Sequence, residues 1–231
     1  MKPEYRTDSP ELVAEIQSQL EPQRIERMRE VIAHRTRELT VLLEVIDKGH
    51  NQSAILRTCE AFGVFDVHIV ESPRKKFRPN RKISKGSHKW LQLHRHRDNV
   101  EAVRHLQKQG FKVLASNLSD DAKPLHTFDL TQKTALLFGT ELVGVAPETV
   151  EACDASFVIP MVGFVQSFNV SVAASISLHE AYRQRVERFG QMGDLSPEEQ
   201  EQVFQWYLTQ SIPRRILHEL QRRQECPNLT K

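Results

Sequence analysis

The chain has 231 residues, of which 39% are hydrophobic and 27% charged, a composition typical of a globular protein with a sizeable core. No apolar run approaches the roughly 18 residues that a membrane span needs, and the start lacks the apolar core of a signal peptide, so we expect a cytoplasmic protein with no membrane partner. Cys59, Cys153 and Cys226 are far apart and form no CxxC pair, which favours reduced thiols over disulfides or a zinc site.

A basic helix is expected close to the N-terminus. Pro22 suits its first turn, and Ile25, Met28 and Ile32 would share one face of it. Five arginines lie in or beside this segment, namely Arg24, Arg27, Arg29, Arg35 and Arg37. We therefore expect residues 1–38 to form a basic helical extension of the main domain.

Strand and helix patterns alternate between residues 39 and 190. Strands are expected at 39–45, 67–70, 90–93, 112–117, 134–138 and 156–159. Helices are expected at about 51–62 with Asn51 as N-cap and Gly63 as the end, at 99–109, briefly from Pro147, and at 169–188. Strands of buried-type residues separated by helices indicate an α/β fold with a mostly parallel sheet that is covered by helices on both faces.

One segment concentrates the positive charge of the chain. Between residues 72 and 97 there are ten lysines and arginines and no acidic residue, although the net charge of the whole chain is only +2. Phe77, His88 and Trp90 lie among these cations. Basic side chains contact phosphates and aromatic rings stack on unpaired bases, so this pattern favours a nucleic-acid surface over a solvated loop without a partner.

The C-terminal segment is expected to be a second helical extension, at residues 191–231. Ser196 to Glu199 form a capping box with proline at the first helical position, and Pro213 should interrupt the helix that follows. Four arginines, Arg214, Arg215, Arg222 and Arg223, make this segment basic as well. Each of the two extensions could pack within the protein or in a dimer, or it could contact RNA. The sequence favours neither alternative.

The segment Ile159–Ser175 (IPMVGFVQSFNVSVAAS) carries the clearest indication of a ligand site. An apolar strand ends at Ile159, and a loop with Ser167 and Asn169 then leads into a helix rich in small residues. Open α/β sheets bind ligands at the carboxyl ends of strands, beside helix N-termini. An ordinary N-cap at Ser167 or Asn169 would explain the same residues without a ligand.

Two other segments could carry chemistry. In HNQSAILRTCEAFGV, from His50, Arg57 lies between the small residues Ala54 and Ala61 on a helix face, where its guanidinium could reach a phosphate or form an ordinary ion pair. In LLFGTELVGVAPE, from Leu136, Gly139 follows a strand and would permit close approach of the backbone to a ligand. Glu141 stands where a dinucleotide fingerprint would need glycine, so that motif is excluded.

These segments together resemble the SPOUT superfamily, and within it the SpoU/TrmH family of RNA ribose 2′-O-methyltransferases. The resemblance covers about residues 35–188 and rests on three ordered motifs, NQSAILRTCEAFGV, FGTELVGV and IPMVGFVQSFNVSVA. The stretches ELTVLLE, GSHKW and EAYRQR are most similar to members of this family that modify tRNA guanosines. The sequence departs from the family pattern at Phe168, where leucine is usual, and at Gly49, where proline is frequent.

The resemblance implies features that the residue pattern alone does not predict. The C-terminal part of the sheet domain, residues 39–190, would thread a loop and form the deep trefoil knot of the SPOUT fold, an exception to the rule that chains avoid threading. The knot loops would hold S-adenosylmethionine. The working unit would be a homodimer with active sites at the interface, and no metal is implied.

The resemblance also implies roles for individual residues. Four would line the cofactor pocket, largely through backbone groups: Ser116, Gly139, Ile159 and Phe168. Five would form the catalytic group: Asn51, Arg57, Glu141, Ser167 and Asn169. Arg57 would face the target ribose from the partner chain, oriented by Asn51 and Glu141. RNA contacts are expected from Lys89, Arg24, Arg27, Arg35, Arg183 and Arg185.

The implied reaction is methyl transfer from a sulfonium to a ribose 2′-hydroxyl of tRNA, with the D-loop guanosine at position 18 as the expected target. A guanidinium stays protonated at neutral pH and is a poor base, so we expect Arg57 to clamp the neighbouring phosphate and polarise the hydroxyl. Two alternatives stay open. One is a related enzyme that acts on ribosomal RNA, and the other is a non-catalytic RNA-binding module with the same fold.

Overall fold

The computed structural model describes residues 9–44, 49–71, 77, 79–140 and 144–225. The chain divides into two compact units: residues 36–192 form the larger, and residues 1–35 together with 193–231 form the smaller. The terminal segments, predicted as two extensions, thus belong to one unit. Among the residues described, no helix is long and apolar enough to cross a membrane.

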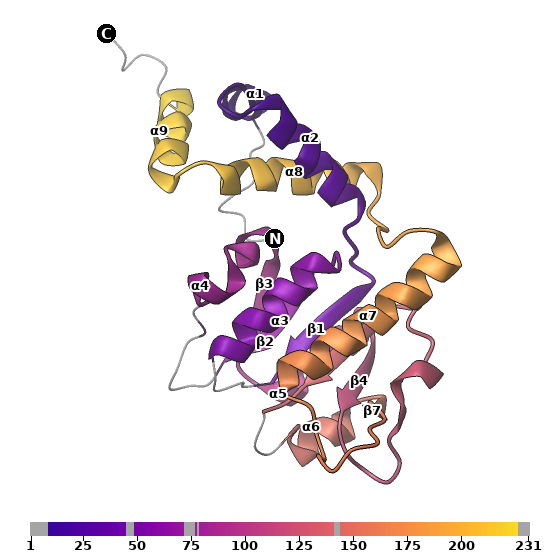
Figure 1. Cartoon of the computed structure of the whole chain (residues 1–231). Helices are drawn as coiled ribbons and strands as arrows, with labels where there is room; N and C mark the ends of the chain where they lie inside the picture. Colours follow the sequence, from indigo (N-terminus) through magenta and orange to yellow (C-terminus); the bar gives the residue numbers. More distant parts are fainter. Residues whose placement is uncertain (1–8, 45–48, 72–76, 78, 141–143, 226–231) are drawn as a thin grey trace. The chain divides into compact units, whose positions relative to one another are not determined.

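The larger unit is built on a seven-stranded sheet, and every strand pair in its described part is parallel (Figure 1). The strands are β1 (Leu39–Leu43), β2 (Asp66–Val70), β3 (Gln92–His96), β4 (Lys112–Ser116), β5 (Lys123–Pro124), β6 (Thr134–Phe138) and β7 (Ala155–Val158). Their order across the sheet is β3-β2-β1-β6-β4-β7-β5. The three sequence motifs follow β1, β6 and β7. Because the strands are parallel, all three motifs lie at the end of the sheet where the strands have their carboxyl ends.

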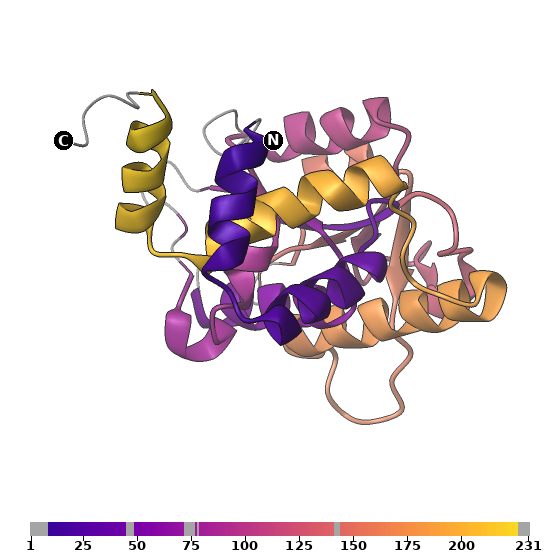
Figure 2. The same cartoon turned by 90° about the horizontal axis from the view of Figure 1, so that it is seen from above.

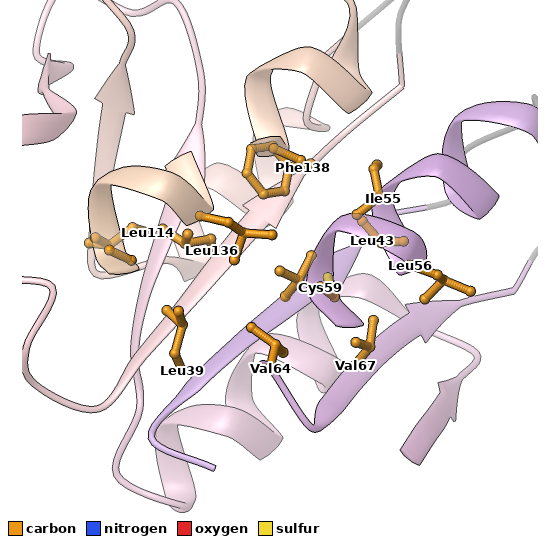
Figure 3. Packing of buried hydrophobic residues seen from close by; sticks show 14 of the residues in the cluster. Leu39, Leu43, Ile55, Leu56, Cys59, Val64, Val67, Leu114, Leu136 and Phe138 are labelled. Atoms are coloured by element: carbon orange, nitrogen blue, oxygen red, sulfur yellow. The ribbon is translucent and has the colours of Figure 1, made fainter. Parts of the chain in front are cut away.

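One face of the sheet is covered by α3 (Gly49–Ala61) and α7 (Val170–Phe189). Leu39 and Leu136 on the strands and Ile55 and Cys59 of α3 belong to one apolar cluster on this face (Figure 3). Ala174, Leu178 and Ala181 of α7 belong to the same apolar cluster. Cys59 therefore packs as the small apolar residue that its sequence context predicts, and burial raises the pKa of its thiol.

The opposite face is covered by α5 (Asn99–Lys108) and α6 (Pro147–Ala152). Val103 and Leu106 of α5 pack against Leu42 and Leu137, which alternate along their strands with the residues of the first face. Both faces of the sheet are thus buried, as the continuous apolar strands predict. The α/β fold and the parallel sheet predicted from the sequence are confirmed.

Several boundaries differ from the sequence prediction. α3 begins at Gly49, so Asn51, which was predicted as its N-cap, lies in the first helical turn. The strand predicted at 90–93 begins later, because Ser87–Trp90 form the 3-10 helix η2. Besides η2, the short elements α4 (Arg81–Ser84), β5 and η3 (Leu125–Thr127) were not predicted. Elements of this length leave no periodic pattern in a sequence.

The smaller unit contains α1 (Pro10–Ser18), α2 (Pro22–Ala33), α8 (Pro197–Ser211) and α9 (Arg214–Glu225) (Figures 1 and 2). α8 packs against α1 and α2. The capping box predicted at its start is present: the hydroxyl of Ser196 accepts from the main-chain N–H of Glu199, whose carboxylate accepts from the N–H of Ser196. The helix ends before Pro213, as predicted.

Candidate functional site

A cavity of about 390 Å³ lies at the carboxyl ends of β4, β6 and β7, and small-molecule sites usually have volumes of this order. Its walls come from these strand ends, from the segment after β7 and from the first turn of α7. The lining residues are Ser116, Asn117, Leu118, Phe138, Gly139, Thr140, Gly144, Phe157, Val158, Ile159, Met161, Ser167, Phe168, Val170 and Ala173. The cavity thus occupies the edge of the sheet where parallel α/β folds bind ligands.

The structure brings the four residues predicted to bind the cofactor around this one cavity. Ser116 is the last residue of β4, Gly139 directly follows β6, and Ile159 directly follows β7. Phe168 lines the cavity from the approach to α7 and is 38% exposed. Ser167, which was predicted to lie beside the cofactor, lines the same cavity. Segments far apart in the sequence therefore line one cavity.

Gly139 is required here by its surroundings. A side-chain Cβ at this position would lie 2.1 Å from the carbonyl oxygen of Gly144 and 2.4 Å from the nitrogen of Val145. Thr140 and Gly144 form an antiparallel bridge, with N–H···O distances of 2.9 and 3.0 Å, which draws the two ends of the loop together. The close approach expected of Gly139 is thus made to the chain's own backbone, and this contact shapes the cavity wall.

The N-terminus of α7 borders the cavity through Val170 and Ala173. Asn169 is its N-cap, and its side-chain oxygen accepts from the N–H of Ser171 at 2.9 Å. The amide nitrogen of Asn169 donates to Oδ1 of Asn51 in α3 at 3.5 Å. Asn169 therefore caps the helix, as the simpler interpretation predicts, and also joins the third motif to the first.

Arg57 lies on an exposed part of α3 and does not line the cavity. The helix turns Ile55 and Cys59 into the core, while Arg57 projects from a different face, as the sequence predicts. Among the described residues it makes no hydrogen bond or ion pair. Glu141, the fifth predicted catalytic residue, lies outside the described residues.

Four of the six cations predicted to contact RNA are accessible to different extents. Arg24 and Arg27 are exposed on α2, and Arg27 pairs with Glu30 at 2.8 Å. Arg183 is exposed on α7, between Glu180 and Glu187. Lys89 is partly buried, with its ammonium 4.4 Å from the ring centre of Trp90. Part of the basic segment, residues 72–76 and 78, lies outside the described part of the chain.

The other two cations are buried, which corrects the sequence-based expectation of RNA contacts. Arg35 is 1% exposed, and its Nε donates to the hydroxyl of Tyr207 at 2.9 Å. Arg185 is 2% exposed and donates to the carbonyl of Thr131 at 3.2 Å. Both guanidiniums satisfy internal acceptors, so they hold the fold together and do not present charge to a polyanion.

Sequence reasoning missed several residues of the cavity. These are Asn117, Leu118, Thr140, Gly144 and Met161. Each lies in the loop that directly follows a parallel strand or closes such a loop. A signal existed, because the carboxyl ends of neighbouring parallel strands meet at one edge, but it can be used only when the strand order is known.

A second polar cluster lies on β2, β3 and α5. The rings of His68 and His94 stack with centroids 4.5 Å apart, and Nδ1 of His68 is 2.9 Å from Nε2 of His96. His105 lies 5.5 Å from His96 between ring centroids. Burial, reinforced by the neighbouring imidazoles, lowers the pKa of His68 to about 2 and that of His96 to about 4. These two rings are neutral at physiological pH.

A parallel sheet with a cavity at its carboxyl edge, bordered by a helix N-terminus, defines an α/β protein that binds a small ligand at that edge. Within the described chain, no group of three histidine, cysteine or acidic residues is arranged to hold a metal ion. The cavity is lined by backbone, hydroxyl, amide and apolar groups.

Comparison with known proteins identifies the family. Residues 38–179 match the SpoU rRNA Methylase family. The tRNA (guanosine(18)-2'-O)-methyltransferase of Thermus thermophilus is 48% identical over 160 residues, which cover 69% of this chain and 82% of that protein. The A. aeolicus TrmH/SpoU tRNA modifying enzyme superposes with a TM-score of 0.77 at 37% identity, covering 83% of this chain and 98% of that one.

A third relative carries the cofactor. The SpoU methyltransferase AviRb from Streptomyces viridochromogenes, solved in complex with AdoMet, superposes with a TM-score of 0.58 at 26% identity, covering 64% of this chain and 60% of that one. The chain belongs to the SpoU methylase family and is a methyltransferase that uses S-adenosylmethionine. The resemblance drawn from the three sequence motifs is confirmed.

Proposed function

We propose that this protein transfers a methyl group from S-adenosylmethionine to the ribose 2′-hydroxyl of the guanosine at position 18 in the D-loop of tRNA, in the cytoplasm. The observation that carries the proposal is the convergence of Ser116, Gly139, Ile159 and Phe168 on one cavity. The activity of the Thermus relative, a tRNA (guanosine(18)-2'-O)-methyltransferase, supports the choice of substrate.

The cavity suits the cofactor chemically. S-adenosylmethionine has an adenine ring, a ribose and a charged amino-acid end, and when bound it supplies a methyl group activated by the sulfonium. Ile159, Met161 and Phe168 offer apolar surface for a flat ring, and Ser116 and Ser167 offer hydroxyls for its polar groups. Gly139 contributes backbone without a side chain. These features support an adenosine moiety lying against the strand ends.

The residues around the cavity would orient the acceptor hydroxyl. The contact between Asn51 and Asn169 brings α3 to the rim, and Arg57 is exposed further along this helix. In our proposal Arg57 clamps the phosphate next to the target ribose with its two-pronged guanidinium and polarises the 2′-hydroxyl. The hydroxyl proton then leaves to water or to that phosphate, since a guanidinium is a poor acceptor at neutral pH.

We further propose that the protein works as a homodimer, with Arg57 of one chain facing the cavity of the other. Large apolar side chains on and before α7 are exposed and support an interface there: Val162, Phe164, Val165, Val172 and Ile176. Solvent-exposed apolar groups in such number usually mark a contact surface. We also propose that the segment between β7 and α7 forms part of a trefoil knot, as family membership supports.

The RNA surface in this proposal includes Lys89, Arg24, Arg27 and Arg183 together with the basic segment at residues 72–97. Trp90 next to Lys89 would add a ring on which a base can stack. These cations would contact phosphates and position the tRNA without reading its sequence.

Transfer assays with labelled S-adenosylmethionine test the substrate. Transcripts of tRNA should be methylated and ribosomal RNA fragments should not, and nucleoside mass spectrometry should find 2′-O-methylguanosine. Methylation of the ribosomal fragments alone would favour the alternative suggested by the family name, an rRNA methylase. Failure of the protein to bind S-adenosylmethionine in calorimetry would favour a non-catalytic RNA-binding module.

Mixed dimers test the shared site. A chain carrying Arg57→Ala and a chain with a cavity blocked by Gly139→Ala should each be inactive. If the site is composite, mixing them produces dimers with one intact site and restores part of the activity. If each chain supplies its own arginine, the mixture stays inactive.

A further inference from the structure

Glu44 directly follows β1 and is buried, with 4% of its surface exposed. Its carboxylate accepts from the main-chain N–H of Ala146 at 3.0 Å and from the hydroxyl of Thr149 at 3.1 Å. It also accepts from the side-chain amide of Asn99. Ala146 and Thr149 belong to the start of α6, whereas Asn99 begins α5. The reaction proposed above makes no use of this carboxylate.

The main chain of Glu44 holds the other end of the same loop. Its N–H donates to the carbonyl of Phe138, the last residue of β6, at 3.0 Å. Glu44 therefore bonds to the residue before Gly139 and to the residues that follow Gly144. Gly139, Thr140 and Gly144 lie between these two anchors and form one wall of the cavity.

We propose that Glu44 is a positioning residue for this wall: by fixing both ends of the loop between β6 and α6 it sets the affinity for S-adenosylmethionine. Glu44 does not line the cavity, so it acts through the loop and not as a catalytic residue. The inference rests on the proposed function, because the wall is expected to contact that cofactor.

The chemistry of the contacts supports a specific role. A buried carboxylate carries a large desolvation cost, and an apolar side chain could fill the same space without it. Burial accordingly raises the pKa of Glu44, while the bonds from Ala146, Thr149 and Asn99 act in the opposite direction. Two of these donors lie on the segment that closes the cavity wall. If the carboxylate were removed, they would be satisfied only after the loop moved.

Calorimetric titration of the full-length protein with S-adenosylmethionine tests the inference in five variants. Glu44→Gln replaces one acceptor oxygen by a donor, and Thr149→Val removes the bond from the Thr149 hydroxyl while the bond from the Ala146 N–H remains. Asn99→Ala removes only the bond to α5, which does not reach the loop. Glu151→Gln, at an exposed carboxylate on α6, is the matched control. Glu44→Asp keeps the charge but shortens the reach.

We expect Glu44→Gln and Thr149→Val to raise the Kd for S-adenosylmethionine by about tenfold, while the KM for tRNA stays within about twofold. Asn99→Ala should lower the thermal midpoint with little change in that Kd, and Glu151→Gln should resemble the wild type. Glu44→Asp should fall between Glu44→Gln and the wild type.

The inference is overturned if Glu44→Gln and Thr149→Val unfold at lower temperature but bind S-adenosylmethionine as tightly as the wild type, because Glu44 would then act only in stability. If Glu44→Gln does not fold, Thr149→Val decides alone. A wild type that does not bind S-adenosylmethionine would instead refute the proposed function, and this inference with it.

Discussion

The side-chain amide of Asn169 donates to Oδ1 of Asn51 at 3.5 Å, across 118 residues of sequence. The contact joins the N-cap of α7 to the first turn of α3. A second contact, between the hydroxyls of Thr58 and Ser175 at 3.2 Å, joins the same two helices further along. Packing of α3 on α7 therefore places the first motif beside the cavity that the third motif lines.

Replacement of Asn169 should harm activity more than stability. Asn169→Ala removes the cap of α7, which should cost about 1 kcal/mol of unfolding free energy. It also removes the contact with Asn51, so methyl transfer should fall by at least about tenfold. Ser196→Ala removes the cap of α8 and serves as the control, with a similar loss of stability and full activity. Equal activities of the two variants would show that Asn169 is only a cap.

A side chain at Gly139 should abolish cofactor binding. The added Cβ of Gly139→Ala would lie 2.1 Å from the Gly144 carbonyl oxygen, so the loop has to move and the cavity wall with it. Gly163→Ala is the matched control, because no atom lies within 4 Å of a Cβ at that position. Calorimetry with S-adenosylmethionine should show binding to Gly163→Ala and no binding to Gly139→Ala. Normal binding by Gly139→Ala would place the cofactor elsewhere.

Arg57→Lys should separate charge from geometry. Lysine keeps the positive charge but loses the two-pronged arrangement of donors, so kcat should fall by about 100-fold. Arg57 is exposed and does not line the cavity, so the affinity for S-adenosylmethionine and the thermal midpoint should not change. Single-turnover kinetics with saturating tRNA provides the measurement. Turnover at the wild-type rate would exclude the proposed clamp.

Much of the fold could be predicted from the sequence, because the strands are short apolar runs with clear breaks. Thr134–Phe138 was predicted with its observed bounds, and Gly63 and Gly110 end helices where expected. The strand order was not predictable from periodicity, since no pattern in β6 indicates that it lies between β1 and β4. The order, and with it the meeting of the motifs, is set by tertiary packing.

The site was predicted less evenly than the fold. Ser116, Gly139, Ile159 and Phe168 came from the family resemblance, and the structure groups them around one cavity. Two of the cations predicted to contact RNA are buried, and a sequence does not show which arginines are buried. Arg35 and Arg185 look like any surface cation until the acceptors at Tyr207 and Thr131 are known. Glu44 was overlooked because all of its partners are distant in sequence.

The histidine cluster should make the fold sensitive to acid. The pKa values of His68 and His96, about 2 and about 4, lie below the usual value of 6.5, so at acidic pH the unfolded chain binds protons that the folded chain does not. Above pH 6.5 these two histidines therefore leave the free energy of unfolding unchanged. Below it the free energy of unfolding falls, by roughly 1.4 kcal/mol per pH unit for His68.

Urea unfolding at several pH values between about 7 and about 5 measures this loss. His68→Gln retains a polar side chain but does not titrate, so the variant should lose less stability on acidification than the wild type. His126, exposed and outside the cluster, offers the control His126→Gln, which should follow the wild type. Parallel curves for all three proteins would show that the cluster does not govern acid stability.

A tRNA with one altered sugar isolates the atom that accepts the methyl group. The protein is incubated with S-adenosylmethionine and either normal tRNA or the same tRNA with 2′-deoxyguanosine at position 18, and the digested nucleosides are analysed by mass spectrometry. We expect 2′-O-methylguanosine from the normal tRNA and no methylated nucleoside from the deoxy form. Methylation of the deoxy tRNA, on a base or at another ribose, would contradict the proposed reaction.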